Sequence, residues 1–211
     1  MIKILQRIIA SIDSCNKAAF YIATFFTILL AFITAEQVLA RYFLNASSVA
    51  LQELEWHLFG AIFLFAAAHT FKEDNHVRVD LIYSKLSKRA QAVINCLGIM
   101  IFLVPVSYII IIYGYAFAKQ ALSFQNPFPA DHFSSNYFEK DSFAYQVGSL
   151  VESFLRSSLL RGEISPDSGG LEARWIIKAC IPFGFVLLLF QSLAEFLRSL
   201  ITIIQFRQIV E

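Results

Sequence analysis

One stretch constrains the fold of this chain more than any other: residues 92–117 run for 26 positions without a single charged side chain. A helix needs about 20 mostly apolar residues to cross the ~30 Å hydrocarbon core of a bilayer. This stretch therefore exceeds the length of a span and leaves room for tilt. Only 16% of the chain is charged, whereas soluble domains carry roughly a quarter. The sequence therefore predicts an integral membrane protein.

Three further apolar stretches complete a predicted set of four spans, at residues 18–39, 51–71, 92–117 and 175–197. Residues 1–17 place Leu5, Ile8, Ile9 and Ile12 on one helical face, which favours an amphipathic segment lying on the membrane surface over a cleaved signal peptide. We expect an all-α integral membrane protein with one membrane domain over residues 1–211. We expect amphipathic surface helices in addition to the four transmembrane helices.

The distribution of basic residues predicts the orientation in the membrane. Residues 1–17 contain three Lys or Arg and residues 72–91 contain five, while residues 42–50 contain none. Because cytoplasmic loops are enriched in Lys and Arg, we expect both termini and residues 72–91 to be cytoplasmic. The chain as a whole has a net charge of +1 with its basic residues spread out, which argues against a nucleic-acid partner.

The long insert at residues 119–173 is predicted to lie outside the cytoplasm, and its seven acidic and four basic residues agree with that side. Within it, apolar residues recur at helical spacing and polar residues occupy the other face. The apolar positions are Val147, Leu150, Val151, Phe154, Leu155 and Leu159. A helix this short and polar does not span a membrane, so we expect it to lie on the outer surface or pack on a partner, with Phe154 and Leu155 as interface candidates.

Ionisable residues in the first two predicted spans are functional candidates by default. Glu36 lies near the outer interface with Arg41 five residues on, and we favour a structural pairing over a role in transport or partner contact. Glu53 and Glu55 lie in the first turns of the second span, where carboxylates stabilise the positive end of the helix dipole. Glu53 and His57 share a face, and hydrogen bonding at the helix start is favoured over a shared proton or ligand site.

The remaining candidates predict no catalytic, cofactor or metal chemistry. Arg174 and Lys178, at the outer end of the fourth span, are expected to extend to lipid headgroups. The predicted topology places Cys15 and Cys96 near one membrane face and Cys180 near the other, where it cannot reach them. The sequence therefore predicts neither a disulfide nor a metal framework. No phosphate-binding loop, nucleophile elbow or metalloprotease motif occurs. We therefore expect a protein that is not an enzyme.

Several short motifs lie in a fixed order relative to the spans. They are V-x-x-R-Y-x-x-N-x-S at residues 38–47, the acids Glu53 and Glu55, H-V-R-V-D-L at residues 76–81, S-G-G-L-x-x-R-W-x-I-K at residues 168–178, and I-P-F-G-F from Ile181. Together they resemble the small membrane subunit of tripartite ATP-independent periplasmic (TRAP) transporters, the DctQ-like family. Within the third motif, His76, Arg78 and Asp80 are expected to fix the cytoplasmic turn.

The resemblance implies a bacterial inner-membrane, multi-pass protein without a cofactor. It implies association with a large membrane subunit that holds the substrate and sodium sites, and with a periplasmic solute-binding protein. The small subunit would brace the large one and help receive the binding protein during ion-coupled uptake of a small solute, for which we expect an organic acid. No substrate-binding residue of the family carries over to this chain, and the insert is longer than in compact members.

Two alternatives from other classes remain. One is a stand-alone small channel or scaffold with an outer loop. The other is a membrane-embedded enzyme that uses Glu36, Glu53 or His57, which is disfavoured because only two of these groups share one helical face.

Overall fold

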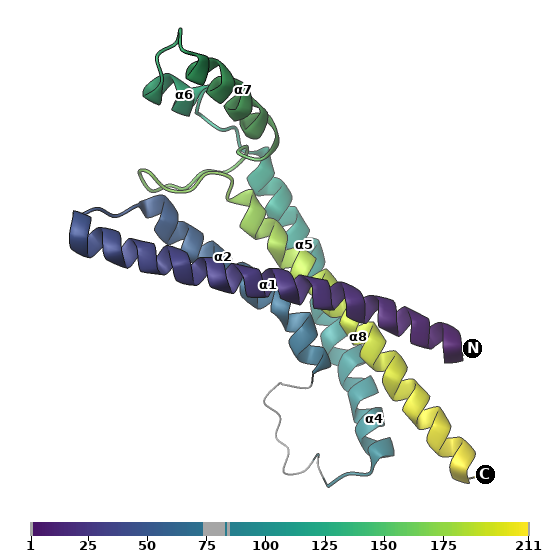
Figure 1. Ribbon diagram of the computed structural model, residues 1–211. Helices are drawn as coiled ribbons and strands as arrows, with labels where there is room; N and C mark the ends of the chain where they lie inside the picture. The colour runs from purple at the N-terminus through teal and green to yellow at the C-terminus, as the bar shows by residue number, and fades with distance from the viewer. Residues whose placement is uncertain (1, 74–82, 84, 211) are drawn as a thin grey trace.

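The computed structural model describes residues 2–73, 83 and 85–210, and the regular elements in that part of the chain are helices (Figure 1). In chain order they are α1 (Ile2–Leu44), α2 (Val49–Lys72), α4 (Lys88–Gly98), the π-helical turn η1 (Ile99–Leu103), α5 (Val104–Ser123), α6 (His132–Tyr137), α7 (Phe143–Ser158) and α8 (Trp175–Val210). The prediction of an all-α protein is confirmed for these residues.

The long helices form two pairs that cross each other (Figure 1). α1 packs along α2, and α5 packs along α8, while α8 also contacts α1, α2 and α4. Both chain ends lie at one end of the molecule, and α6 and α7 project from the opposite end, beyond α5 and α8. The fourth long helix is therefore the element that joins the two pairs.

All four predicted spans fall within helices that are long and apolar enough to cross a membrane. These helices cover Ile4–Leu44, Val49–Lys72, Lys88–Ser123 and Trp175–Ile204. The expectation of a separate surface-lying segment at residues 1–17 is wrong, because α1 continues from Ile2 to Leu44 without interruption. No glycine or proline occurs in that range to end the helix. At ~1.5 Å per residue the 43 residues of α1 extend ~65 Å, so this helix is strongly tilted or projects beyond the hydrocarbon.

Small residues let the helices approach closely, as is typical of membrane helix packing. The buried core shared by α1, α2 and α8 consists of Ala19, Ala23, Ala61, Phe65, Ala68 and Leu187. A Cβ atom added to Gly184 of α8 would lie 2.8 Å from the Cβ atom of Leu64 in α2. Larger side chains point outward instead, with Phe32, Phe63 and Phe102 each about 70% exposed. The interior is therefore lined by small residues and the surface by large apolar ones.

The turn between α1 and α2 is formed by residues that are typical of turns and helix starts. Asn45 takes a left-handed conformation with a φ of 51°, which ends α1. The Ser48 side chain then accepts a hydrogen bond from the backbone N–H of Leu51 at 3.4 Å and caps the start of α2. The turn between the first two helices is therefore short and fixed by side chains typical of turns.

Candidate functional site

The insert folds into a compact unit, and we call residues 124–173 the cap. α6 and α7 pack against each other, and the chain then returns to the start of α8 (Figure 1). Ser142 caps α7 by accepting from the backbone N–H of Tyr145 at 3.1 Å. The Asn126 amide donates to the carbonyl of Leu160 at 2.8 Å and to the Glu172 carboxylate at 3.2 Å, so it joins the start of the cap to the end of α7 and to the returning chain. The cap is therefore a folded element rather than a plain linker.

A buried carboxylate organises the inside of the cap. Glu152 of α7 is only 7% exposed. It accepts hydrogen bonds from the backbone N–H groups of Phe133 and Ser134, both at 2.8 Å, and from the Ser134 hydroxyl at 2.9 Å. Arg156 donates to Glu152 at 2.7 Å and to Glu172 at 2.8 Å. This network joins α6, α7 and the returning chain.

The ionisation of these groups follows from the same contacts. Burial opposes the charge on Glu152, but the backbone N–H groups of Phe133 and Ser134, together with Arg156, outweigh it and lower its pKa to about 2. Burial also opposes the charge on Arg156, yet its bonds to Glu152 and Glu172 raise its pKa above the usual value. Glu152 and Arg156 are therefore both charged at neutral pH.

Glu152 and Arg156 of α7 point into the cap, and the apolar face of the helix points outward. Leu150 is 71% exposed and Phe154 is 68% exposed, and Val147 and Val151 beside them are also exposed. We call these four residues the α7 face. The predicted amphipathic helix is therefore present, but Leu155, proposed with Phe154 as an interface residue, is half-buried. A contiguous exposed apolar face of this kind is typical of an interaction surface.

Glu53 ties the cap to α2. Its carboxylate accepts a hydrogen bond from the Ser165 hydroxyl at 2.5 Å and from the backbone N–H of Leu171 at 2.7 Å. Gly170 closes the loop between them, where an added Cβ atom would lie 2.4 Å from the Cβ atom of Ser165. These contacts agree with the structural interpretation of Glu53. They reach a loop more than one hundred residues away, whereas the sequence suggested bonding at the helix start.

Two further candidates at the start of α8, Lys178 and Arg174, have different neighbours from those expected. Lys178 forms an ion pair with Glu163 and lies 4.1 Å from the ring centroid of Phe117, instead of extending to headgroups. The Arg174 Nε atom is buried without a hydrogen-bond partner among the described residues.

The remaining candidates lie apart from this loop. Glu36 accepts from the Gln37 side chain at 2.8 Å, and no ion pair with Arg41 forms in the described part of the chain. One carboxylate oxygen of Glu55 is buried without a hydrogen-bond partner there. The cytoplasmic turn that His76, Arg78 and Asp80 are expected to fix lies outside the described residues.

A second polar network joins α1, α2 and α8 on the side of the molecule where both chain ends lie. We call it the helix-end cluster, and it consists of Asp13, Asn16, Lys72, Gln191, Glu195 and Arg198. Gln191 of α8 is fully buried. It accepts from Asn16 at 2.6 Å and donates to Asp13 at 3.3 Å and to Glu195 at 3.1 Å. The cluster therefore connects α1 with α8 across most of the sequence.

Ion pairs complete the helix-end cluster. Arg198 pairs with both Asp13 and Glu195, and the Lys72 ammonium at the end of α2 lies 3.5 Å from Asp13. Sequence reasoning did not select any of these residues. Glu195 falls inside the predicted fourth span, so the rule that intramembrane charges are functional or paired could have found it. Its partner Asp13 could not be found that way, because it lies 182 positions away in a segment that was expected to lie on the surface.

Comparison with known proteins gives a family for this fold. The family described as "Tripartite ATP-independent periplasmic transporters, DctQ component" matches residues 19–134, which is more than half of the chain. The chain belongs to the DctQ family. The match covers most of α1, all of α2, α4 and α5, and reaches α6, while α7 and α8 lie beyond it. No curated protein matches the chain.

Membership defines the class of the protein. DctQ proteins are components of TRAP transporters, a family of transporter subunits rather than enzymes, and they work with a large membrane subunit and a periplasmic binding protein. The resemblance from the sequence is therefore confirmed. The motif at residues 168–178 lies outside the matched range. The start of this motif belongs to the loop whose Ser165 and Leu171 donate hydrogen bonds to Glu53.

Proposed function

We propose that this DctQ protein braces the large membrane subunit of a TRAP transporter and helps receive the solute-binding protein during ion-coupled uptake of a small organic acid. The observation that carries the proposal is the distribution of side chains. Polar groups are paired inside the chain, in the cap and in the helix-end cluster, while large apolar side chains on the long helices and on α7 point outward.

The apolar surface of the long helices supports the bracing role. In the most apolar 18-residue segment of α1, of α2 and of the α4–α5 helix, only 11% of the residues are buried within the chain. In the corresponding segment of α8 the share is 22%. Four helices with so little of their surface covered have wide faces free for lipid or for a larger membrane protein. Membership in a family that works with a large membrane subunit favours the protein partner for part of that surface.

The α7 face supports the docking role. Burial of a large apolar side chain such as Leu150 or Phe154 contributes roughly 1.5–3 kcal/mol, so the face can supply a substantial part of the free energy of a contact with a partner. The cap carries more acidic than basic residues, which disfavours attraction to anionic headgroups. A protein partner is therefore the better fit for this face, and we place it on the periplasmic side.

The test is a double substitution on the α7 face. Leu150→Asp with Phe154→Asp adds two charges where the proposal needs an apolar contact, and neither residue supports the inside of the cap. We expect solute uptake in cells to fall at least tenfold, with less large subunit or binding protein recovered in co-purification and no change in which solute is preferred. The four long helices should still insert, because none of them contains a substitution.

The matched control adds the same two charges to exposed cap positions away from α7, Gln125→Asp with Asn136→Asp. It should leave uptake and co-purification within about twofold of the unmodified protein. Normal uptake and intact assembly in the Leu150/Phe154 variant would contradict the docking role. Normal uptake by cells that lack this chain altogether would contradict the bracing role as well.

A further inference from the structure

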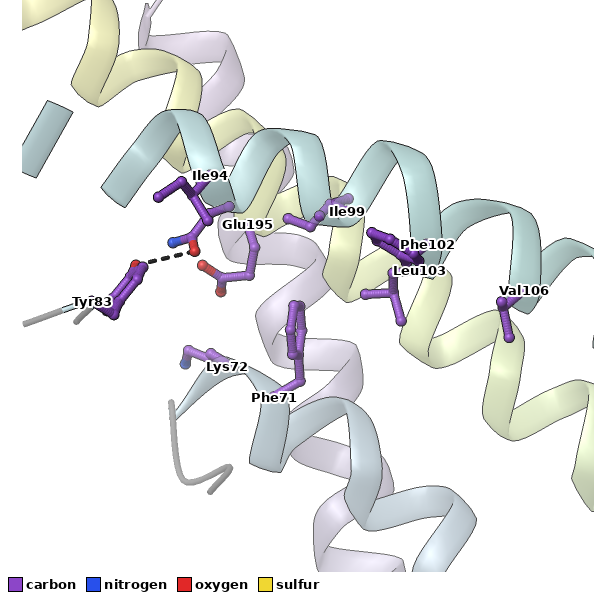
Figure 2. Close-up of a pocket in the computed structure, with 11 residues that line it drawn as sticks. Phe71, Lys72, Tyr83, Ile94, Ile99, Phe102, Leu103, Val106 and Glu195 are labelled. Atoms are coloured by element: carbon purple, nitrogen blue, oxygen red, sulfur yellow. Dashed lines mark hydrogen bonds between the residues drawn. The ribbon is translucent and has the colours of Figure 1, made fainter. Parts of the chain in front are cut away.

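A cavity lies between the end of α2, the α4–η1–α5 helix and α8, close to the helix-end cluster (Figure 2). Its volume is about 810 Å³. The described residues that line it include the apolar side chains of Ile94, Ile99, Phe102, Leu103 and Val106 from the α4–η1–α5 helix. These residues follow one another along a helix that is apolar enough to span a membrane, so the cavity has one polar end and one long apolar wall.

The π-helical turn helps to shape this wall. In η1 the backbone N–H of Val104 bonds to the carbonyl of Ile99, five residues earlier, which widens the helix there. Gly98 comes directly before this turn, and a Cβ atom placed on it would meet no other atom within 4 Å. The absent side chain of Gly98 therefore leaves room on the cavity side. Single π turns in α-helices are often found at functional sites.

The polar groups of the cavity gather toward one end. Lys72, Tyr83, Asn95 and Glu195 line it there, and the Tyr83 hydroxyl donates to Asn95 at 3.0 Å (Figure 2). Glu195 is already paired with Arg198. The Lys72 ammonium lies 3.5 Å from Asp13 and 3.8 Å from Glu73 and makes no hydrogen bond within the described residues. Lys72 can therefore donate to an additional oxygen ligand.

We propose that this cavity binds an anionic phospholipid, with its phosphate at Lys72 and one acyl chain along Ile99, Phe102 and Val106. The Lys72 ammonium at the polar end and the apolar wall beyond it match the two parts of such a lipid. Lys88 and Arg89, which begin α4 on the same side, add positive potential near that end. Basic pockets between membrane helices on the cytoplasmic side bind anionic headgroups in the same way. The choice of the cytoplasmic leaflet rests on the orientation predicted from the charges, whereas the site itself does not.

The experiment uses the full chain, delipidated in mild detergent and titrated with phosphatidylglycerol or with phosphatidylcholine of the same acyl chains. Native mass spectrometry gives the dissociation constant of the first bound lipid. We expect phosphatidylglycerol to bind at least fivefold more tightly. Lys72→Gln should reduce that preference to below twofold. Gly98→Phe should weaken both lipids at least fivefold, because Gly98 lines the cavity and a larger side chain there would take up space that the lipid needs.

Lys85→Gln is the matched control, since it removes one exposed positive charge from the same side without touching the cavity. It should keep the preference within twofold. Equal binding of the two lipids, or an unchanged preference in both Lys72→Gln and Gly98→Phe, would overturn the lipid site.

Co-purification with the large subunit separates this proposal from the proposed function. If Gly98→Phe abolishes co-purification and leaves lipid binding unchanged, a helix of the large subunit fills the cavity and the lipid site is wrong. If the unmodified chain binds lipid as expected and recovers no large subunit, the bracing role fails and the lipid site stands.

Discussion

The cap and the helix-end cluster are both networks of charged side chains, but they hold different things together. In the cap, Glu152, Arg156 and Glu172 lie within 21 consecutive residues and join short elements that are neighbours in sequence. In the helix-end cluster, Asp13 and Arg198 join α1 to α8 across 185 positions. The first network stabilises one local unit, whereas the second fixes how long helices cross. Loss of the first should therefore stay local, and loss of the second should spread through the molecule.

The largest effect is expected for Glu152→Ala. This change removes every bond that Glu152 makes, and it leaves the N–H groups of Phe133 and Ser134 and one side of Arg156 unpaired in a buried site. Removal of one partner from a buried pair typically costs about 3–5 kcal/mol. Amide hydrogen exchange followed by mass spectrometry should show the cap opening by about that amount. Protection in α1, α2 and α8 should change by less than about 0.5 kcal/mol, and a loss that spreads equally to those helices would contradict a local network.

A smaller but wider effect is expected for Asp13→Asn. Asp13 receives Arg198 and Lys72 and is partly exposed, so the loss should be about 1.5–3 kcal/mol, the range for hydrogen bonds to charged groups. The thermal midpoint in mild detergent should fall, and exchange should increase in α1, α2 and α8 together. Glu73→Gln is the control, because Glu73 makes only one loose contact with Lys72 at 3.8 Å. An effect of Asp13→Asn confined to α1 would show that the cluster does not join the helices.

The smallest effect is expected when the pH is lowered, because the stability of the cap should not change near neutral pH. The pKa of Glu152 is about 2 in the folded chain and 4.5 as the usual reference value, so its contribution is present above pH 4.5 and is lost as the pH falls toward 2. Exchange in the cap, corrected for the intrinsic pH dependence of the exchange rate, should be flat from pH 7 to 5 and should rise below 4.5. Glu152→Gln should lack that rise. A cap that loosens between pH 7 and 5 would contradict this assignment.

The helices were predictable because their signal is one of composition along a continuous stretch. Each predicted span lies within an apolar helix, and Asn45 and Ser48 mark the first turn as their side-chain chemistry indicates. The start of α1 was misjudged because Ile8, Ile9 and Ile12 suggest a surface helix when seen alone. The adjacent span and the absence of a helix breaker make the two segments one helix.

The polar networks were largely beyond sequence reasoning. Spacing divided α7 into an apolar and a polar face, but it gave no indication that Glu152 is buried by contacts with Phe133 and Ser134. Glu53 was singled out for its position in the helix, while its partners Ser165 and Leu171 belong to a distant loop. Which charges meet depends on how the helices cross, and that arrangement is not encoded in local spacing.

The central claim is that the two networks lie on opposite sides of the membrane, with the cap in the periplasm. Cysteine labelling of intact cells tests it most directly, in a background where Cys15, Cys96 and Cys180 are replaced. Asn136→Cys lies on the exposed surface of the cap, and Lys85→Cys is exposed before α4 on the side of the helix-end cluster. A membrane-impermeant maleimide should label position 136 in intact cells and position 85 only after the cells are opened. Labelling of position 85 but not of position 136 in intact cells would contradict the account.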